Sequence, residues 1–413
     1  MAIHRIKVSN FKSFKKLDLE LGKFNVVVGA NASGKSNFIS ILGFIRDIAN
    51  EGLDNAISRQ GSEYLSNIGV RSPQTVSMKL MLSELMTGFN VAESVVARVE
   101  QASYEFDLKI APKKTGFGVT KDRLTMKLIF DQWNAEARKR KEPRILGTGR
   151  LIVRNEKGHV RINLEKPSSL KAKAVDIFPR FLQREIPPNT ILLRSPYFFV
   201  PPPISRDFSD IAIYDFDPKQ SKKAVPVTGK SELENDGNNL SLVLKKIVEN
   251  EAQKRKFSNL LKDVLPFIDD LETEKFADKF LLFKLKEKYF EDTYFPASFI
   301  SDGTVNISAL LIALYFEKKA LTIIEEPERN IHPYRISKVM AMMKDASKHK
   351  QIILTTHSPE VVKYTDLRDI LLVSRDKDGF STISRPSEKN EVKIFLENEL
   401  GLDELYVQNL LAV

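Results

Sequence analysis

The sequence predicts an α/β protein, built as a mixed sheet with flanking helices and carrying a basic α+β insertion. Three observations indicate this class. Residues 24–28 are a run of strand formers, which a small-residue loop connects to a helical pattern over residues 36–48. From residue 299 onwards, apolar strand and helix patterns alternate, as in parallel α/β sheets. Between them, residues 111–175 form a basic segment with little regular periodicity.

Composition limits the class of protein. The chain has 413 residues, of which 42% are hydrophobic and 29% charged, and this balance is typical of globular domains. No window approaches the roughly 18 uninterrupted apolar residues of a membrane-spanning helix. The N-terminal residues alternate like a strand and lack the apolar core of a signal peptide. The absence of cysteine excludes disulfides, thiolate metal sites and a cysteine nucleophile, so we expect a cytoplasmic protein with no membrane contact.

The positive charge is concentrated in one segment. The whole chain has a net charge of +10, while residues 111–175 contain 17 basic and 6 acidic residues, a net charge of +11. The densest run is Arg138-Lys139-Arg140-Lys141. A local basic surface suits contact with a nucleic-acid backbone, because each neutralised phosphate releases counterions. A solvated charged loop is the alternative interpretation.

Strand pairs are expected on both sides of this segment. Alternation over residues 3–21 predicts two strands joined near residues 10–13. A second pair is predicted over residues 151–164, with a turn at residues 155–158. Near the C-terminus, Asp376 and Asp378 form a D-x-D followed by glycine, which we interpret as a hairpin turn and not as a metal site.

The loop after residue 28 has the spacing of a phosphate-binding motif. Gly29 is followed by four residues and then by Gly34-Lys35-Ser36, which completes G-x-x-x-x-G-K-[ST] between a strand and a helix. Backbone N–H groups of such a loop surround phosphate, and the helix N-terminus adds positive potential. We expect Lys35 to reach the β- and γ-phosphates and the Ser36 hydroxyl to bind Mg²⁺. The predicted nucleotide-binding residues of this loop are Gly29, Asn31, Ser33, Gly34, Lys35, Ser36 and Asn37.

Two further strand ends carry polar residues suited to phosphate chemistry. The apolar run 321–324 ends at Glu325 and Glu326, which suit a metal ligand and a general base respectively. His357 follows the apolar run 352–354, and a histidine there can hydrogen-bond a γ-phosphate or a water molecule. A structural histidine and solvated acids are the alternatives.

In this order, the motifs resemble the ABC-type P-loop ATPase heads of the SMC, RecF and OLD families. They are most similar to bacterial RecF/OLD-like AAA family ATPases of the phage-defence type. The resemblance is based on GANASGKSN, YDFDP, DGNNL and residues 295–373, and leaves residues 105–190 uncovered. It implies that Ser301 and Gly303, in a serine-aspartate-glycine-threonine signature, contact the γ-phosphate of the opposing subunit's nucleotide. This signature departs from the more familiar serine-glycine-glycine form.

The resemblance also implies roles for single residues. Glu325 corresponds to the Walker B acid, Glu326 to the catalytic glutamate and His357 to the switch histidine. Asn330 falls at the subunit-contacting D-loop, where His332 is expected to order the turn. Gln60 and Gln74 are the candidates for the Q-loop glutamine. Because 56 residues follow His357, we expect no Toprim nuclease of the kind that OLD proteins append, and because the sequence lacks long heptad repeats, we expect no SMC-type arm.

These implications define the expected function. The chain would bind ATP and Mg²⁺, form a homodimer or higher oligomer around ATP, and control DNA, through residues 111–175, or a separately encoded effector, in anti-phage defence. A nucleotide-locked scaffold with little turnover and a RecF-like repair ATPase are the alternatives. The expected domain organisation is an N-terminal part of the head at 1–110, a basic insertion at 111–190, a helical and strand region at 191–298, and a C-terminal part of the head at 299–413.

Overall fold

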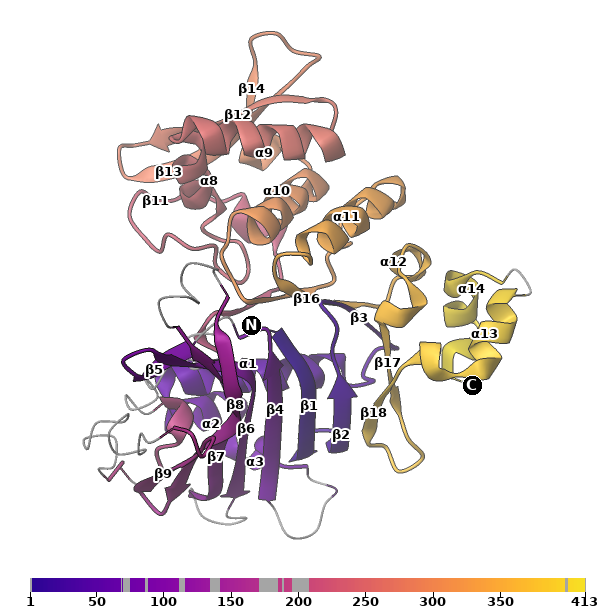
Figure 1. Cartoon of the computed structure of the whole chain (residues 1–413). Helices are drawn as coiled ribbons and strands as arrows, with labels where there is room; N and C mark the ends of the chain where they lie inside the picture. The colour runs from indigo at the N-terminus through magenta and orange to yellow at the C-terminus, as the bar shows by residue number, and fades with distance from the viewer. Residues whose placement is uncertain are drawn as a thin grey trace. The chain divides into compact units, whose positions relative to one another are not determined.

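The computed structural model describes most of the chain, as two compact units (Figure 1). The described residues are 2–67, 69, 75–85, 88–110, 116–133, 142–170, 185–187, 189–194, 208–397 and 400–412. The first unit comprises Met1–Gly22, Ser36–Ile211 and Ser374–Ile383, and the second unit comprises Lys23–Lys35, Ala212–Val373 and Ser384–Val413. The four-part division expected from the sequence remains a prediction. No helix within the described ranges is long and apolar enough to cross a membrane.

The first unit is built on an antiparallel sheet of eight strands. Its order is β2-β1-β4-β6-β7-β8-β9, with β5 paired to β6. The strands are β1 (Ala2–Phe11), β2 (Phe14–Glu20), β4 (Thr75–Ser83), β5 (Gly88–Ala92), β6 (Val95–Ile110), β7 (Phe117–Gln132), β8 (Arg144–Glu156) and β9 (His159–Glu165). Burial alternates along β4, β6 and β7, so one face of the sheet is packed and the other meets solvent.

Three helices follow the nucleotide loop in this unit: α1 (Lys35–Glu51), α2 (Leu53–Gln60) and α3 (Ser62–Leu65). They lie behind the sheet in the view of Figure 1. The rings of Phe11 on β1 and Phe44 on α1 are 5.9 Å apart, which fixes the helix on the buried face. A short helix, η2 (Leu192–Arg194), is held by a buried network, in which Asp122 accepts hydrogen bonds from Tyr104 and from the Leu192 N–H.

Both strand pairs expected from alternation are confirmed. The β1–β2 hairpin turns at residues 12–13, and the β8–β9 hairpin turns at residues 157–158. Regular structure in the basic segment extends beyond the predicted strand pair, because β7 spans 16 residues of it although the sequence there showed little regular periodicity. The run 138–141 lies outside the described residues, as does Gln74.

The turn at Asp376 is confirmed, since its Oδ1 accepts the N–H groups of Asp378 and Phe380 at 3.0 and 2.8 Å, and β18 (Ser381–Ser384) follows.

The second unit contains the parallel strands predicted from apolar runs. Five strands of its sheet lie in the order β10-β15-β16-β3-β17, and the pairs β15–β16, β16–β3 and β3–β17 are parallel. Their bounds are β3 (Phe24–Val28), β10 (Ile211–Tyr214), β15 (Leu321–Glu325), β16 (Gln351–Thr356) and β17 (Ile370–Arg375). Nearly all residues of β3, β15 and β16 are buried, which explains why they read as continuous apolar runs.

A second, antiparallel sheet and the eight α-helices of the described residues complete this unit. The sheet has the order β11-β13-β12, with β14 paired to β13. Its strands are β11 (Val225–Pro226), β12 (Ile268–Phe276), β13 (Phe280–Glu287) and β14 (Tyr294–Pro296). The helices are α7 (Pro218–Ser221), α8 (Leu240–Val248), α9 (Glu251–Val264), α10 (Asp302–Tyr315), α11 (Pro333–Ala346), α12 (Pro359–Lys363), α13 (Asn390–Glu397) and α14 (Leu402–Val407).

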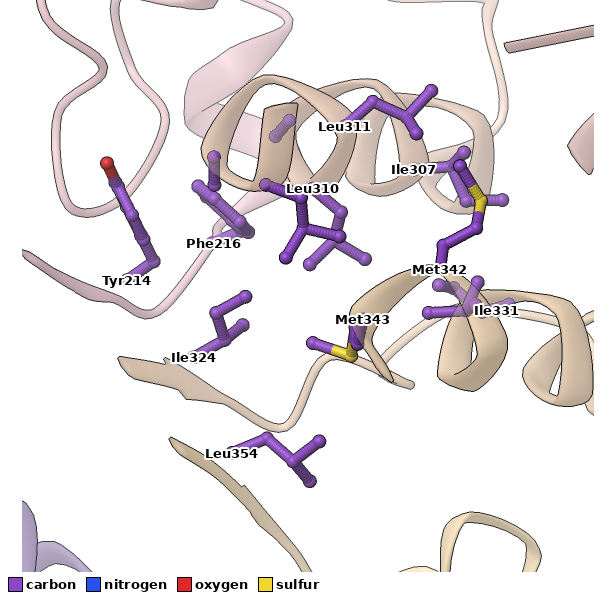
Figure 2. Packing of buried hydrophobic residues seen from close by; sticks show 14 of the residues in the cluster. Tyr214, Phe216, Ile307, Leu310, Leu311, Ile324, Ile331, Met342, Met343 and Leu354 are labelled. Carbon is purple, nitrogen blue, oxygen red and sulfur yellow. The ribbon is translucent and has the colours of Figure 1, made fainter. Parts of the chain in front are cut away.

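The core of the second unit lies between the parallel strands and helices α10 and α11 (Figure 2). Ile307, Leu310 and Leu311 of α10 pack with Met343 of α11 and Ile324 of β15. Helix α10 is buried over almost its whole length after its first turn. The residues that begin this helix and end these strands are therefore held by close packing.

Candidate active site

The loop between β3 and α1 has a conformation that its two glycines permit. A Cβ atom on Gly29 would lie 2.4 Å from the Val373 carbonyl oxygen and 2.8 Å from Ser33 Oγ, so a side chain does not fit there. Gly34 has a φ of +119°, in the region that favours glycine. The conformation of this loop therefore explains why the motif has glycine at positions 29 and 34.

Lys35 is placed over this loop. Its Nζ donates hydrogen bonds to the carbonyl oxygens of Gly29 (2.7 Å) and Ala30 (3.1 Å). Burial lowers the pKa of Lys35, and the charges of Glu326 and Glu328 oppose that effect. The lysine charge therefore lies in the field of two glutamates from the end of another strand.

The loop residues differ in exposure. Asn31 and Ser36 are exposed, whereas Ser33 and Gly34 are buried. Ser36 and Asn37, which belong to the first unit, directly follow Lys35 in α1. Asn37 Nδ2 donates a 2.8 Å hydrogen bond to Ser13 Oγ in the β1–β2 turn. The predicted loop residues up to Lys35 therefore belong to the second unit, and Ser36 and Asn37 belong to the first.

The strand register brings the other predicted residues to the same edge of the sheet. Glu325 is paired with Thr355 across β15 and β16, and Thr356 is paired with Val28 across β16 and β3. Glu326, His357 and Gly29 are the residues that follow these positions. The carboxyl ends of adjacent parallel strands are where open α/β sheets bind their ligands.

Glu326 is the centre of a charged network. Its Oε1 lies 3.0 Å from His357 Nδ1, and its Oε2 lies 3.1 Å from Arg329 Nη2. Burial raises the pKa of Glu326, but the Arg329 hydrogen bond and the charges of His357 and Arg329 outweigh it, so the pKa is lowered. Its φ of +44° is unusual for a residue with a side chain. The carboxylate is thus ionised near neutral pH and directed towards the histidine.

Arg329 was not expected from the sequence. Its Nη1 lies 2.9 Å from Asp215 Oδ1, while its other terminal nitrogen holds Glu326. Asp215 lies just after β10, and the only sequence signal for it is its place in YDFDP. A buried amide, Asn306 on α10, donates a 2.6 Å hydrogen bond to the Arg329 carbonyl.

Two further carboxylates flank Glu326. Burial raises the pKa of Glu325, and the negative charges of Asp215 and Glu326 raise it further. Glu328, also missed in the sequence, accepts a hydrogen bond from the Thr356 hydroxyl. Its Oε2 is buried and has no hydrogen-bond partner among the described residues. Excess negative charge at this strand end suits a bound cation.

The signature residues begin helix α10. Ser301 is the N-cap, and its Oγ accepts the Thr304 N–H at 3.3 Å. A Cβ on Gly303 would lie 2.4 Å from the Asn330 carbonyl oxygen. The signature and the predicted D-loop are therefore in close contact within one chain. His332 caps α11 by accepting the Tyr334 N–H, so the prediction that it orders this turn is confirmed.

The first unit contains a pocket of about 490 Å³. Asn37 of the nucleotide loop and Gln60, a Q-loop candidate, line it, together with Tyr64. Its remaining lining residues are Lys12, Ser13, Ser66, Asn67, Gly69, Arg375, Asp378, Gly379 and Phe380. In the part of the chain that is described, no group of three or more His, Asp or Glu side chains could hold a metal ion alone.

Comparisons with known proteins identify a family and a fold. Residues 150–363 match the family described as "AAA domain, putative AbiEii toxin, Type IV TA system", and residues 1–138 match an AAA ATPase domain. An SMC head solved in complex with the C-winged helix domain of ScpA is 17% identical, with a TM-score of 0.52 over 93% of this chain and 97% of that one. The Thermotoga maritima SMC head is also 17% identical, with a TM-score of 0.45 over 93% of this chain and 99% of that one.

A curated relative gives a short sequence match. The chromosome partition protein Smc of Methanocaldococcus jannaschii is 46% identical over 46 residues, which are 11% of this chain and 4% of that protein. The mixed α/β fold resembles an SMC head of the ABC ATPase type over most of the chain. The chain belongs to the AAA domain family that matches residues 150–363, and it is an ATP-binding P-loop ATPase of the RecF/SMC-like type.

Proposed function

We propose that Lys35, Glu326 and His357 carry out ATP hydrolysis in this ATPase. Lys35 would hold the β- and γ-phosphates, Glu326 would polarise the attacking water, and His357 would hydrogen-bond the γ-phosphate or the water. The observation that carries this proposal is the 3.0 Å contact between Glu326 and His357 at the sheet edge that also holds the loop from Gly29. An ionised carboxylate beside a histidine suits the removal of a proton from water.

The loop would bind the phosphates through its backbone. The residues proposed for this role are Gly29, Asn31, Ser33, Gly34, Lys35, Ser36 and Asn37. The positive φ of Gly34 and the start of α1 at Lys35 support it, because both direct N–H groups towards an anion. Among the described residues, Lys35 Nζ donates to two neutral carbonyl oxygens, which a phosphate would replace with a charge-assisted contact.

Mg²⁺ is the cofactor that this donor set fits. We propose that Glu325 would supply a carboxylate oxygen and Ser36, whose side chain is exposed, a hydroxyl oxygen, both of the type that Mg²⁺ binds, and that phosphate oxygens and water would complete its shell. The raised pKa of Glu325 reflects crowded negative charge from Asp215 and Glu326, which a cation would offset. When bound, Mg²⁺ neutralises the charge that develops on the transferred phosphoryl group.

We further propose that two chains dimerise around ATP, so that Ser301 and Gly303 of one contact the γ-phosphate held by the other. Two large aromatic side chains near these residues support an interface here: Phe299 is 80% exposed and Tyr334 is 86% exposed. Exposed aromatic residues are common anchors of interfaces. ATP would then act as a switch, because its γ-phosphate bridges the subunits until it is hydrolysed.

Mixing two inactive variants tests this composite site. Ser301→Arg should block hydrolysis but leave ATP binding, and Lys35→Ala should block productive phosphate binding. A mixed dimer keeps one complete site, made of Lys35 from the first variant and Ser301 from the second. We expect turnover to return on mixing. Two inactive variants that stay inactive together, although they form mixed dimers, would contradict the composite site.

The basic segment presents arginines in a cross-strand row. Arg123 on β7 is paired with Arg154 on β8, which is paired with Arg161 on β9. Two rows further along the same face, beyond the pair Thr125 and Ile152, Lys127 is paired with Arg150. Directly opposed like charges destabilise a sheet unless an anion lies between them. We therefore propose that the solvent face of β7–β9 binds the phosphate backbone of DNA.

Charge reversal of this row tests the DNA contact. Arg154→Glu should weaken binding of a labelled DNA duplex. It should also reduce the slope of log affinity against log salt concentration by about one. Lys348→Glu, an exposed basic position in the second unit, is the control. Equal affinities and equal salt slopes for both variants would contradict a DNA contact at β7–β9.

For the cellular role, we propose that the ATPase cycle controls a separately encoded effector in anti-phage defence. The family description, which names a toxin of a type IV toxin–antitoxin system, supports a role of this kind. A nucleotide-locked scaffold with little turnover is the alternative, and the Glu326–His357 pair favours turnover. Phage challenge of cells that express either the wild-type chain or Glu326→Gln would separate them. Equal growth phenotypes would favour the scaffold.

A further inference from the structure

We infer that Arg329 is the positioning residue for Glu326, held in place by Asp215 and by Asn306. The inference rests on the proposed role of Glu326 as the group that activates water. Asp215 lies in YDFDP and Arg329 within residues 295–373, but neither was assigned a role by the sequence. Both lie in the second unit, so their contacts with Glu326 are internal to one unit.

The guanidinium of Arg329 connects two carboxylates. One terminal nitrogen lies 3.1 Å from Glu326 Oε2 and the other lies 2.9 Å from Asp215 Oδ1. Because the guanidinium is planar, an anchor at Asp215 fixes the direction from which the arginine reaches Glu326. His357 occupies the other oxygen of Glu326. A carboxylate can accept roughly four hydrogen bonds, so the two contacts orient Glu326 and still leave lone pairs for water.

The main chain of Arg329 is anchored as firmly as its side chain. Its N–H donates to the Glu326 carbonyl at 3.0 Å, and its carbonyl accepts from Asn306 Nδ2 at 2.6 Å. Asn306 is 4% exposed and lies on α10, the helix that Ser301 begins. If α10 moves when Ser301 contacts a nucleotide, the hydrogen bond from Asn306 would therefore move Arg329. Arg329 would in turn change the position of Glu326.

A contribution to folding stability does not by itself explain the ion pair between Arg329 and Asp215. The side chains of Arg329 and Asp215 are 42% and 56% exposed, and ion pairs with such exposure contribute little to folding. The same unit contains a comparable pair, Lys338 and Asp263, with side chains 45% and 53% exposed and 2.7 Å apart. That pair has no contact with Glu326, so it serves as a matched control.

Steady-state ATP turnover by the full chain tests the inference. Arg329→Gln should lower kcat about tenfold with little change in KM, because misplacing a reacting group by about 1 Å costs up to ~100-fold in rate. Arg329→Lys, which keeps the charge, should recover part of the loss. Asp215→Asn should lower kcat less, and the double variant should equal Arg329→Gln alone, because the two residues act in series. Lys338→Gln should match the wild type.

The outcomes separate this inference from the proposed function. Wild-type kcat in both Arg329→Gln and Asp215→Asn, alongside an inactive Glu326→Gln, would overturn the role of Arg329 and leave that of Glu326 intact. An active Glu326→Gln would overturn the proposed function itself. A loss of thermal stability in Arg329→Gln beyond that of Lys338→Gln, with unchanged kcat per folded molecule, would assign Arg329 a structural role and also overturn the inference.

Discussion

Replacing Gly29 by alanine is the sharpest steric perturbation that the nucleotide loop offers. The new Cβ would lie 2.4 Å from the Val373 carbonyl oxygen, whereas ordinary contact begins at 3.4 Å. Val373 lies on β17, which pairs with β3 through backbone hydrogen bonds, so the carbonyl has little freedom to withdraw. The loop itself must therefore move by about 1 Å to relieve the contact.

That displacement sets the expected magnitude. A 1 Å misplacement of groups that position a substrate costs about 100-fold in rate, so kcat/KM for ATP should fall by roughly that factor in Gly29→Ala. Steady-state turnover and binding of a fluorescent ATP analogue measure it. Gly118→Ala on β7 is the matched control, because no atom of the described residues lies within 4 Å of its added Cβ.

The control should turn over ATP like the wild type. If Gly29→Ala also keeps kcat/KM within about twofold of the wild type, the close approach to Val373 does not constrain phosphate binding. The argument that the first glycine is required for steric reasons would then be refuted.

Three other predictions concern separate parts of the chain. Gly303→Ala should lower turnover without weakening ATP binding, since its Cβ would lie 2.4 Å from the Asn330 carbonyl oxygen; unchanged kcat would contradict a constrained signature. Burial raises the pKa of Asp122 from 3.8 to about 6, so the folded state holds its proton more tightly than the unfolded state does. The free energy of unfolding should therefore fall by about 3 kcal/mol in total as pH rises from well below 4 to well above 6, and urea titrations of Asp122→Asn should lack this slope; an identical slope in both would exclude Asp122 as its source. Tyr64→Ala should raise KM for ATP more than it lowers kcat, because Asn37 of the nucleotide loop lines the same pocket; an unchanged KM would separate the pocket from the nucleotide.

Local patterns in the sequence were sufficient to predict much of the site. Residues 24–28, 321–325 and 351–356 are buried on both faces, so their apolar runs predicted parallel strands, which the structure confirms. The polar residues at their ends were identified because parallel strands bring their carboxyl ends to one edge. The roles assigned to Glu326 and His357 remain predictions.

Contacts between distant residues could not be predicted in this way. Arg329 and Asp215 are 114 residues apart, and each alone resembles an ordinary surface charge. The close approach of Gly303 to Asn330 likewise depends on how α10 packs against the chain after β15. Neither contact has a local signature, since both arise from tertiary packing.

The basic segment shows a different limit. The segment was described as having little regular periodicity, yet Leu124, Met126 and Leu128 alternate as buried residues along β7. The intervening Arg123 and Lys127 lie on the other face, where the register pairs them with arginines of β8. The alternation was present in the sequence, but the pairing that forms the arginine row depends on strand register.

The central claim is that Glu326 activates water in an ATP site formed by the loop at Gly29–Lys35. Its most direct test is to measure ATP binding and ATP turnover of Glu326→Gln and the wild-type chain in parallel. The account predicts that the variant binds ATP as tightly as the wild type and loses turnover by at least about 100-fold. A variant that hydrolyses ATP at the wild-type rate would contradict it.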